Sequence, residues 1–303
     1  MAAEPFLRWA GGKRQLLSLI HAALPADFDL SKHRFFEPFV GGGAVMLSLD
    51  SHPSGAAVRS SKKKRPRIVV NDVNEELIAT YRALQNHVDD VVSLLKTRAV
   101  GTSEADFYNA RDHWTPTTGP EVAARMIYLN RLAFNGLYRV RADGAFNVPY
   151  GKIKNPTVCN ESRLRDVADW LSFVEIRSGS FIAALNDARE GDVVYLDPPY
   201  LPLTPTSSFS KYAKDDFREM EHGALKGAIE RLTERGARVI LSNSNTELTR
   251  DIFSDVVDLR VVSVSRSISA AAGSRTRVEE VLGLNYPIAD AYDPAVVGAL
   301  PQA

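Results

Sequence analysis

The chain has 303 residues, enough for two structural units or for one large unit that carries an insertion. Lys plus Arg number 37 and Asp plus Glu also number 37, so total charge does not mark a nucleic-acid binder, and any such contact must come from local patches. The single cysteine, Cys159, excludes an intrachain disulfide, no apolar run approaches the roughly 18 residues of a membrane span, and no Cys/His spacing predicts a metal site.

Apolar runs alternate with helical patterns along most of the chain, which predicts an α/β sheet. In chain order, strands are expected at 35–40, 67–71, 192–196, 237–242, 256–264 and 278–286. Helices are expected at 44–49, 73–96 and 215–235. The segment 50–66 and the tail after Pro287 have the composition of loops.

The stretch 76–150 interrupts this alternation, because its pattern is mostly helical until Phe134. Two short strand patterns follow, Leu137–Arg141 and Ala145–Val148, on either side of Ala142-Asp143-Gly144. An Asp-Gly pair between short strands is a β-hairpin signal. We interpret 76–150 as a smaller domain inserted between strands of the sheet.

The sharpest chemical signal is Asp197-Pro198-Pro199-Tyr200, directly after the apolar run at 192–196. An exocyclic aromatic amine is a poor nucleophile because its lone pair is delocalised into the ring. The Asp197 carboxylate and the Pro198 carbonyl can accept hydrogen bonds from both N–H groups of such an amine, and proline holds the carbonyl in place because its φ is fixed. Tyr200 can stack on a flat base. A plain turn at the end of a strand is the alternative interpretation.

A glycine turn, Gly41–Gly43, follows Phe39 and the first expected strand. Glycine lets the backbone approach a ligand closely, and α/β sheets bind ligands in the crevice beyond the carboxyl ends of their strands. Asp72, at the end of the next strand, is placed to bind ribose hydroxyls. The alternatives are a purely structural turn and an Asp72 that caps the following helix.

Near the N-terminus, Gly11–Lys13 suggests a phosphate-binding loop. That interpretation fails because Leu7 stands where glycine is needed and Arg14 where Ser or Thr is needed. A lysine beside a glycine turn can still hold a ligand carboxylate. Trp9, taken alone, favours core packing.

The segment from Asn130 to Gly151 is dense in Arg, Asn and aromatic residues. A two-stranded ribbon fits the DNA major groove, where Arg reads guanine, Asn reads adenine and apolar groups contact the thymine methyl. A solvated hairpin is the alternative. The basic run Lys62–Arg67 favours a solvated loop over a DNA patch, although it could add a phosphate contact.

Together these motifs resemble those of the DNA adenine N6-methyltransferases in which the cofactor motif precedes the target-recognition domain and the catalytic motif follows it. The resemblance is closest to the bacterial and phage enzymes of the DNA adenine methylase (Dam) type, which act on GATC, and covers about residues 5–286. It implies a Rossmann-like, mixed, seven-stranded α/β sheet. The catalytic domain would comprise 1–75 and 151–290, the inserted helical target-recognition domain with its β-hairpin 76–150, and the tail 291–303.

The resemblance also implies roles for individual residues. Cofactor contacts fall on Trp9, Lys13, Phe39, Gly41, Gly43, Asp72 and Asp197, and catalysis on Asp197, Pro198, Pro199 and Tyr200, acting on an adenine rotated out of the duplex. Base contacts fall on Arg8, Leu137, Arg139 and Pro149, with Asn135 or its neighbour filling or flanking the gap that the base leaves. Phosphate-side contacts fall on Arg266, Ser267, Arg275 and Arg277. Two departures from the pattern are the long 50–66 segment and Ala133, where relatives have an aromatic residue or Cys.

The sequence therefore predicts a site-specific enzyme that transfers a methyl group from S-adenosylmethionine to adenine N6 in double-stranded DNA, in GATC by likeness to the family. We expect it to need no metal, to act as a monomer away from membranes, and to work in the cytoplasm of a bacterium or a phage-infected cell. The alternatives are an amino-methyltransferase for another planar amine (cytosine N4, RNA or protein glutamine) and a DNA-binding homologue without catalysis.

Overall fold

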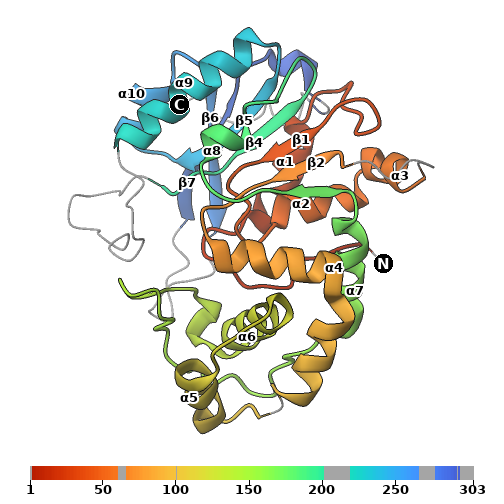
Figure 1. Ribbon diagram of the computed structural model, residues 1–303. Coiled ribbons are helices and arrows are strands. Elements are labelled where there is room, and N and C mark those ends of the chain that lie inside the picture. Colours follow the sequence, from red (N-terminus) through yellow and green to blue (C-terminus); the bar gives the residue numbers. More distant parts are fainter. Residues whose placement is uncertain are drawn as a thin grey trace.

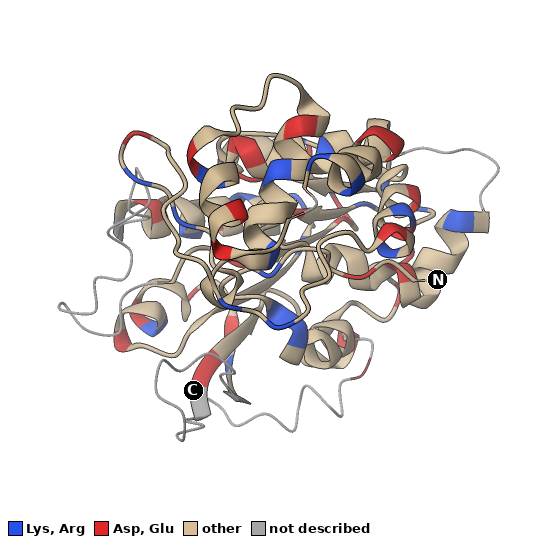
Figure 2. Ribbon diagram, turned by 90° about the horizontal axis from the view of Figure 1, so that it is seen from below, with Lys and Arg blue, Asp and Glu red and all other residues tan. Residues whose placement is uncertain are grey.

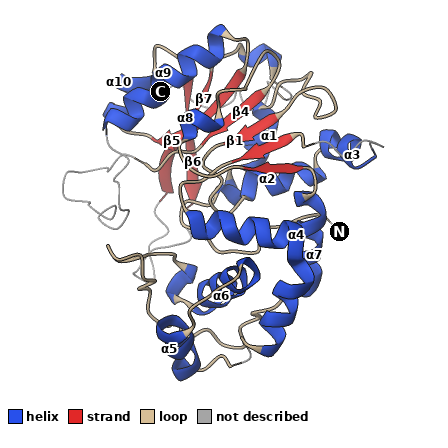
Figure 3. Cartoon of the chain, in the orientation of Figure 1, coloured by secondary structure: helices blue, strands red, loops and turns tan. Residues whose placement is uncertain are grey.

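The computed structural model describes residues 2–60, 66–99, 101–200, 219–265, 277–291 and 293. Its centre is a seven-stranded sheet with the strand order β3-β2-β1-β4-β5-β7-β6 (Figures 1 and 3). The strands are β1 (Phe35–Glu37), β2 (Ile68–Val70), β3 (Val174–Ile176), β4 (Val193–Leu196), β5 (Arg238–Ser244), β6 (Asp258–Ser265) and β7 (Arg277–Leu284). β3, β2, β1, β4 and β5 run parallel, whereas β7 is antiparallel to both β5 and β6, so the sheet is mixed as predicted.

Helices cover both faces of the sheet (Figure 1). One layer contains α1 (Leu17–Ala23), α2 (Ala44–Ser48), α4 (Glu75–Thr97) and α7 (Glu161–Leu171); the other contains α8 (Phe181–Ala184), α9 (Glu219–Glu234) and α10 (Glu247–Phe253). In the part of the chain that the structure describes, no helix is long and apolar enough to cross a membrane.

The strands are apolar on both sides because each side packs against a helical layer. Neighbouring residues alternate between the two cores: Phe35 enters the core under α1 and α2, and Phe36 enters the core under α8 and α9. Val193 and Val194 of β4 divide in the same way. A parallel sheet buried on both faces therefore explains the near-continuous apolar runs of the sequence.

Helices α5 (Glu104–His113) and α6 (Gly119–Leu132) lie beyond α4, on its side away from the sheet (Figure 1). A single hydrophobic cluster joins them to the sheet through α4, and it includes Phe107 of α5 and Ile127 of α6. α4 bends at His87, whose φ of −143° is not helical. The long helical pattern at 73–96 is thus one element with a kink.

The predicted hairpin is present but shorter than expected. Val140 and Phe146 form one antiparallel bridge, without regular strands on either side. The Arg141 N–H donates to the Ala145 carbonyl at 2.9 Å, and Gly144 takes a left-handed φ of +82° in the turn. The Asp-Gly signal located the reversal correctly, since glycine adopts this conformation without strain.

The expectation of a loop at 50–66 is wrong for much of its length. Residues 49–51 form a short 3-10 helix, and α3 (Pro53–Ser60) follows it. Proline is favoured at a helix start, Val58 is buried, and Arg59 forms an ion pair with the buried Asp50, Nη2 to Oδ2 being 2.8 Å. Composition does not reveal these contacts, because they form only when the segment packs against the rest of the chain.

Three other boundaries differ from the prediction. β1 ends at Glu37, not at residue 40, because Pro38 and the glycine turn leave the sheet. β3 was not predicted, since three residues are too few to show a periodic pattern. The tail after Pro287 begins with a 3-10 helix, Ile288–Asp290, and Ala291 pairs with Pro25.

A buried histidine next to α3 leads to a prediction on stability. Nδ1 of His52 accepts a hydrogen bond from the Ser54 N–H at 3.2 Å, and its ring packs against His21 and Phe28. Burial, aided by the nearby His21, lowers the pKa of His52 from 6.5 to about 4. Protonation is therefore easier in the unfolded chain, so this stabilisation is complete above pH 6.5 and lost as the pH falls toward 4. We expect protonation of His52 to lower the free energy of unfolding by about 1–3 kcal/mol between pH 6.5 and 4.

Urea unfolding at several pH values measures this effect. In His52→Gln the free energy of unfolding should depend less steeply on pH between 6.5 and 4 than in the wild-type protein. The exposed His113 provides the control, because His113→Gln should leave the slope unchanged. Equal slopes for wild type and His52→Gln would show that His52 binds protons equally well in both states.

Candidate active site

The predicted cofactor and catalytic residues meet at the carboxyl ends of β1 and β4. These strands are neighbours, yet the next strands, β2 and β5, lie on opposite sides of the pair. A crevice opens at such a switch in strand order, and α/β sheets bind their ligands there. Residues 39–43 leave β1 at this point, and Asp197 directly follows β4.

The glycine turn is shaped to let Trp9 lie against bare backbone. Gly41 and Gly43 have left-handed φ values of +46° and +68°. A side chain on Gly41 would come within 2.9 Å of the Trp9 ring, and one on Gly42 within 2.8 Å of the Trp9 Cβ. The other side of Trp9 stacks on Tyr138 of the hairpin, with ring centroids 5.2 Å apart. Trp9 therefore links the predicted cofactor turn to the predicted DNA-binding hairpin.

Tyr81 of α4 packs against the same glycine turn, Gly41–Gly43. This buried residue of α4 donates a hydrogen bond from its hydroxyl to the Gly41 carbonyl at 2.9 Å. A Cβ atom on Gly43 would lie only 2.6 Å from that hydroxyl oxygen. Phe39 turns to the other core, where its ring lies 5.3 Å from that of Phe181. Glycine is thus required at position 43 for both its φ and the close approach of Tyr81.

Asp72 ties the glycine turn to the start of α4. Its Oδ2 accepts from the Gly41 N–H at 3.0 Å and its Oδ1 from the Asn74 N–H at 2.9 Å. The helix cap considered for Asp72 is instead Asn74, whose side chain accepts from the Leu77 N–H. Burial raises the pKa of Asp72, and the two backbone hydrogen bonds oppose that rise. Asp72 therefore lies at the turn, at the carboxyl end of β2.

A further acidic residue, Glu37, ends β1 beside this turn. Its Oε2 accepts from the Met46 N–H at 2.8 Å. Burial holds the pKa of Glu37 well above its usual range, and the carboxylates of Asp197 and Asp72 raise it further. Three carboxyl groups thus gather at the ends of β1, β2 and β4, and burial favours the neutral form of Glu37.

Asp197 is held by two side chains. Its Oδ1 lies 2.9 Å from the Lys13 ammonium and accepts from the Ser242 hydroxyl at 3.1 Å. The Ser242 hydroxyl is in turn hydrogen-bonded to the hydroxyl of the buried Tyr195 at 2.9 Å. Burial raises the pKa of Asp197, whereas the Lys13 charge and hydrogen bond lower it. Lys13 is itself only 5% exposed, so its ammonium belongs to the site at Asp197–Tyr200, which is called the corner below.

The rest of the motif forms a rigid end to the corner. Pro198 is buried, Pro199 is exposed and Tyr200 is half-buried. The Tyr200 hydroxyl donates to Glu280 Oε2 at 2.7 Å and accepts from Lys13. Burial raises the pKa of Tyr200, and the negative charges of Asp197 and Glu280 raise it further, so the hydroxyl stays protonated.

The predicted DNA-binding residues gather around the hairpin, with Arg8 fixed against it. The Asn130 side chain accepts from the Arg8 N–H at 2.8 Å and donates to the carbonyls of Arg8 at 2.7 Å and Gly136 at 2.9 Å. Gly136 has a φ of +62°, and a side chain there would come within 2.4 Å of Arg8. Asn130 and Gly136 therefore set the position of an exposed arginine.

The tip that precedes the hairpin presents an exposed pair of residues. Asn135 has a left-handed φ of +53°, and the neighbouring Phe134 is 46% exposed. The Phe134 N–H donates to the carbonyl of the exposed Pro149 at 2.9 Å, which joins the two ends of the hairpin region. Leu137 is half-buried beside them. An exposed aromatic ring of this kind can enter a base stack.

Arg139 is oriented by a residue of the opposite arm. Its Nε donates to Asn147 Oδ1 at 2.7 Å, and its Nη2 donates to the Asn147 carbonyl at 3.2 Å. These two hydrogen bonds hold the Arg139 guanidinium along the hairpin.

The remaining DNA contacts suggested by the resemblance cannot be placed. Arg266, Ser267 and Arg275 lie outside the described residues, and of Arg277 only its backbone position at the start of β7 is described. Figure 2 shows Lys and Arg interspersed with Asp and Glu over the described helices. The predicted DNA contacts therefore rest on the hairpin and Arg8.

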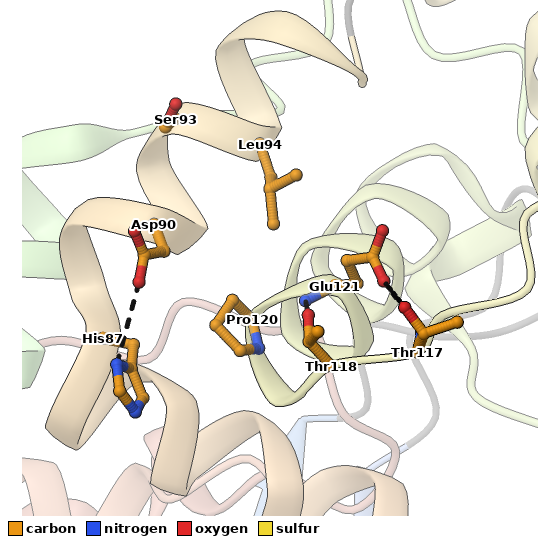
Figure 4. Close-up of a pocket in the computed structure, with 8 residues that line it drawn as sticks. All are labelled: His87, Asp90, Ser93, Leu94, Thr117, Thr118, Pro120 and Glu121. Carbon is orange, nitrogen blue, oxygen red and sulfur yellow. Dashed lines mark hydrogen bonds and ion pairs between the residues drawn. The ribbon is translucent and has the colours of Figure 1, made fainter.

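A separate hollow of about 540 Å³ lies between α4 and α6 (Figure 4). It is open and shallow, and it is lined by His87, Asp90, Ser93, Leu94, Thr117, Thr118, Pro120 and Glu121. Figure 4 shows the Thr117–Glu121 hydrogen bond and the His87–Asp90 ion pair at its rim. These residues belong to α4, to α6 or to the two residues before α6, far in sequence from the glycine turn and from Asp197.

Sequence reasoning missed several residues of the site, among them Glu37, Tyr81, Asn130 and Glu280. Asn130 was noted only as the start of the hairpin motif, and Glu280 only as part of a strand. A charged residue in the middle of the apolar run 278–286 was the available signal for Glu280, since a buried carboxylate needs a partner. Its partners, Tyr200 and Lys13, are too far away in sequence to be inferred.

The residues at the crevice fit S-adenosylmethionine. The carboxyl groups of Asp72 and Asp197 at the crevice suit a cationic ligand that carries hydroxyl donors, and the Lys13 ammonium beside Asp197 suits the carboxylate of that ligand. The sheet, with its antiparallel β7, and this site define a Rossmann-like methyltransferase. Asp197-Pro198-Pro199-Tyr200 at the end of β4 is the motif that the sequence resemblance associates with methylation of a planar amine.

Comparison with known proteins identifies the family. Residues 9–268 match the family of D12 class N6 adenine-specific DNA methyltransferases. The chain is 33% identical over 290 residues to the type II methyltransferase M1.LlaDCHI of Lactococcus lactis, covering 93% of this chain and 95% of that protein. It is 35% identical over 300 residues to the type II methyltransferase M.MjaIII of Methanocaldococcus jannaschii (94% and 100% covered). It is 34% identical over 285 residues to the DNA adenine methylase of Escherichia coli K12 (93% and 95% covered).

The chain therefore belongs to the D12 class N6 adenine-specific DNA methyltransferase family. It is an adenine-specific DNA methyltransferase that uses S-adenosylmethionine and acts on DNA.

Proposed function

We propose that the protein methylates N6 of an adenine rotated out of duplex DNA, in the sequence GATC. The observation that carries the proposal is the arrangement of Asp197 and Pro198 beside the glycine turn, at the switch in strand order. The target sequence is supported by likeness to the DNA adenine methylase of Escherichia coli, which is similar over most of the chain.

When bound, S-adenosylmethionine supplies an electrophilic methyl group and a positive charge on sulfur. We assign its surroundings to Trp9, Lys13, Phe39, the turn at Gly41 and Gly43, Asp72 and Asp197. Asp72 is placed to accept from ribose hydroxyls, and Lys13 to attract a carboxylate. These assignments rest on the position of each side chain at the crevice.

At Asp197, Oδ1 is engaged by Lys13 and Ser242. We therefore assign the adenine amine to Oδ2 and its second N–H to the Pro198 carbonyl. Both acceptors draw the nitrogen toward a pyramidal geometry, in which its lone pair is released from the ring. The carboxylate then stabilises the positive charge that develops on nitrogen, and burial, by raising the pKa of Asp197, suits it to accept the departing proton. Tyr200 offers a flat ring against which the base stacks.

We assign target recognition to residues 76–150 and catalysis to 1–75 and 151–290. The hairpin carries Leu137, Arg139 and Pro149, and Arg8 is fixed against it by Asn130. Phe134 and Asn135, at its exposed tip, suit the gap that a flipped base leaves. One chain carries the acceptor corner, the turn and the hairpin, so we propose that the enzyme acts as a monomer in a bacterium or a phage-infected cell.

Expression in a host without adenine methylation tests the proposal. Sequencing that detects modified bases should find N6-methyladenine on both strands of GATC sites. Labelled cofactor should transfer its label to duplex DNA and not to RNA or protein. Label in cytosine, RNA or protein, or a chain that neither binds cofactor nor methylates DNA, would overturn the proposal.

Arg139 should determine which bases are accepted. We expect Arg139→Ala to reduce discrimination at one base position by about 1–3 kcal/mol, because a guanidinium reads guanine through paired hydrogen bonds. The measurement is kcat/KM on every single-base variant of the preferred site. Arg141→Ala is the control, since Arg141 is exposed on the same hairpin and pairs with Asp143 at 3.1 Å. Unchanged discrimination would remove Arg139 from the base-reading residues.

A further inference from the structure

Glu280 is a buried carboxylate that neither the motifs nor the proposed chemistry uses. It lies in β7, opposite Ser244 of β5 and Val262 of β6, and is 9% exposed. Its Oε2 is 2.7 Å from the Tyr200 hydroxyl and 3.8 Å from the Lys13 ammonium. A buried carboxylate is costly unless it is paired, and both of its partners here belong to the catalytic corner.

The neighbouring Glu279 shows that this placement is specific to position 280. Side chains alternate between the two faces of a strand, so consecutive glutamates point in opposite directions. Glu279 is exposed and accepts from the Asn245 side chain at 2.8 Å. Only Glu280 of this pair turns toward the corner.

The hydrogen bonds around Tyr200 have a fixed direction. The three N–H groups of Lys13 are directed at the Gly11 carbonyl at 3.1 Å, at Asp197 Oδ1 at 2.9 Å and at the Tyr200 oxygen. The Tyr200 hydroxyl has one hydrogen, which it donates to Glu280. A chain of donors therefore runs from Lys13 through Tyr200 to Glu280. Without Glu280, the largely buried Tyr200 hydroxyl would lose its acceptor.

This chain fixes both ends of the Tyr200 ring. The backbone end follows Pro198 and Pro199, whose φ angles are restricted, and the hydroxyl end is anchored to β7 by Glu280. The Lys13 ammonium lies 4.5 Å from the ring centroid and adds a third contact. The hydroxyl lies on the axis about which the ring rotates, so Glu280 fixes where the ring lies, and the Lys13 contact over its face restricts that rotation. A ring that is ordered before the base arrives lowers the cost of ordering it in the reaction.

We propose that Glu280 is a positioning residue for methyl transfer: it holds the Tyr200 ring at the position where the target adenine stacks. The inference rests on the proposed function of Tyr200. Glu280 acts through the Tyr200 hydroxyl and touches neither the base nor the cofactor. Its removal should therefore slow the chemical step and leave DNA and cofactor affinity nearly unchanged.

Single-turnover methylation of a duplex with one target site tests this role. Glu280→Leu should slow the reaction by about 10- to 100-fold, since misplacement of a reacting group by about 1 Å costs rate on this scale. Glu280→Gln keeps an oxygen acceptor for the hydroxyl and should recover most of the rate. Glu279→Gln should match the wild-type protein. Equal rates for Glu280→Leu and wild type would overturn the proposal.

Combining the change with Tyr200→Phe separates positioning from general damage to the fold. Tyr200→Phe removes the hydroxyl, so adding Glu280→Leu should slow that variant by less than about threefold. Fully multiplicative losses, or a loss of cofactor affinity in Glu280→Leu as large as the loss of rate, would contradict an action through Tyr200. A wild-type protein that fails to methylate DNA would instead refute the proposed function itself.

Discussion

Methylation is expected to fall by at least about 10³-fold when Asp197 is replaced by alanine, while binding of duplex DNA is retained. In the proposed mechanism, the carboxylate supplies one of the two acceptors that activate the adenine amine and the negative charge that stabilises it during transfer. The predicted DNA contacts lie on Arg8 and the hairpin, which the substitution does not touch. Single-turnover kinetics and an electrophoretic binding assay with the same duplex measure the two effects.

Asp255→Ala provides the matched control. Asp255 is an exposed carboxylate that pairs with Lys226 at 2.5 Å, so its loss should leave turnover and DNA binding unchanged. Substantial turnover by Asp197→Ala would contradict the role assigned to this carboxylate. A parallel loss of DNA binding would show that the residue supports the recognition surface instead.

A methyl group added at Gly43 should damage the proposed cofactor site through both backbone strain and a close contact. The left-handed φ of +68° costs an alanine about 1–2 kcal/mol, and its Cβ would lie 2.6 Å from the Tyr81 hydroxyl. Because Tyr81 is buried and bonded to the Gly41 carbonyl, relief of that contact must move the turn. We expect Gly43→Ala to lower the unfolding free energy by about 2–4 kcal/mol in all and to weaken cofactor binding by at least about tenfold.

Calorimetric titration with cofactor and urea unfolding test this expectation. Gly144→Ala is the control, since Gly144 has a φ of +82° but nothing within 4 Å of an added Cβ. Gly144→Ala should lower the free energy of unfolding only by the cost of placing alanine at a left-handed φ, with cofactor affinity unchanged. If Gly43→Ala bound cofactor as tightly as the wild-type protein, the glycine turn would not form part of that site.

The N-terminal segment connects the three parts of the proposed reaction. Arg8 lies against the hairpin, Trp9 lies between the glycine turn and Tyr138, and Lys13 reaches Asp197. The six residues 8–13 thus include contacts to the hairpin, to the glycine turn and to Asp197. A base bound by the hairpin and a cofactor held at the turn would both act on this segment, which gives the two ligands a physical route for coupling.

Sequence patterns predicted six of the seven strands, the glycine turn, the turn at Asp197 and the hairpin reversal. Each of these depends on local chemistry: apolar runs form buried strands, glycine permits left-handed φ, and Pro198 restricts the chain after Asp197. Local patterns did not reveal β3, which has only three residues, or α3, in which Arg59 pairs with Asp50 outside the helix.

The tertiary structure alone decided which distant side chains share the site. Glu280 meets Tyr200 because β7 lies antiparallel beside β5, and Asn130 meets Arg8 because α6 packs beside the N-terminal segment. Asp72 holds the glycine turn, and Asn74 caps the helix. Hydrogen bonds and ion pairs act over about 3 Å, so partners separated by 80 or 122 residues are set by the packing of whole elements. No periodicity along the chain carries that information.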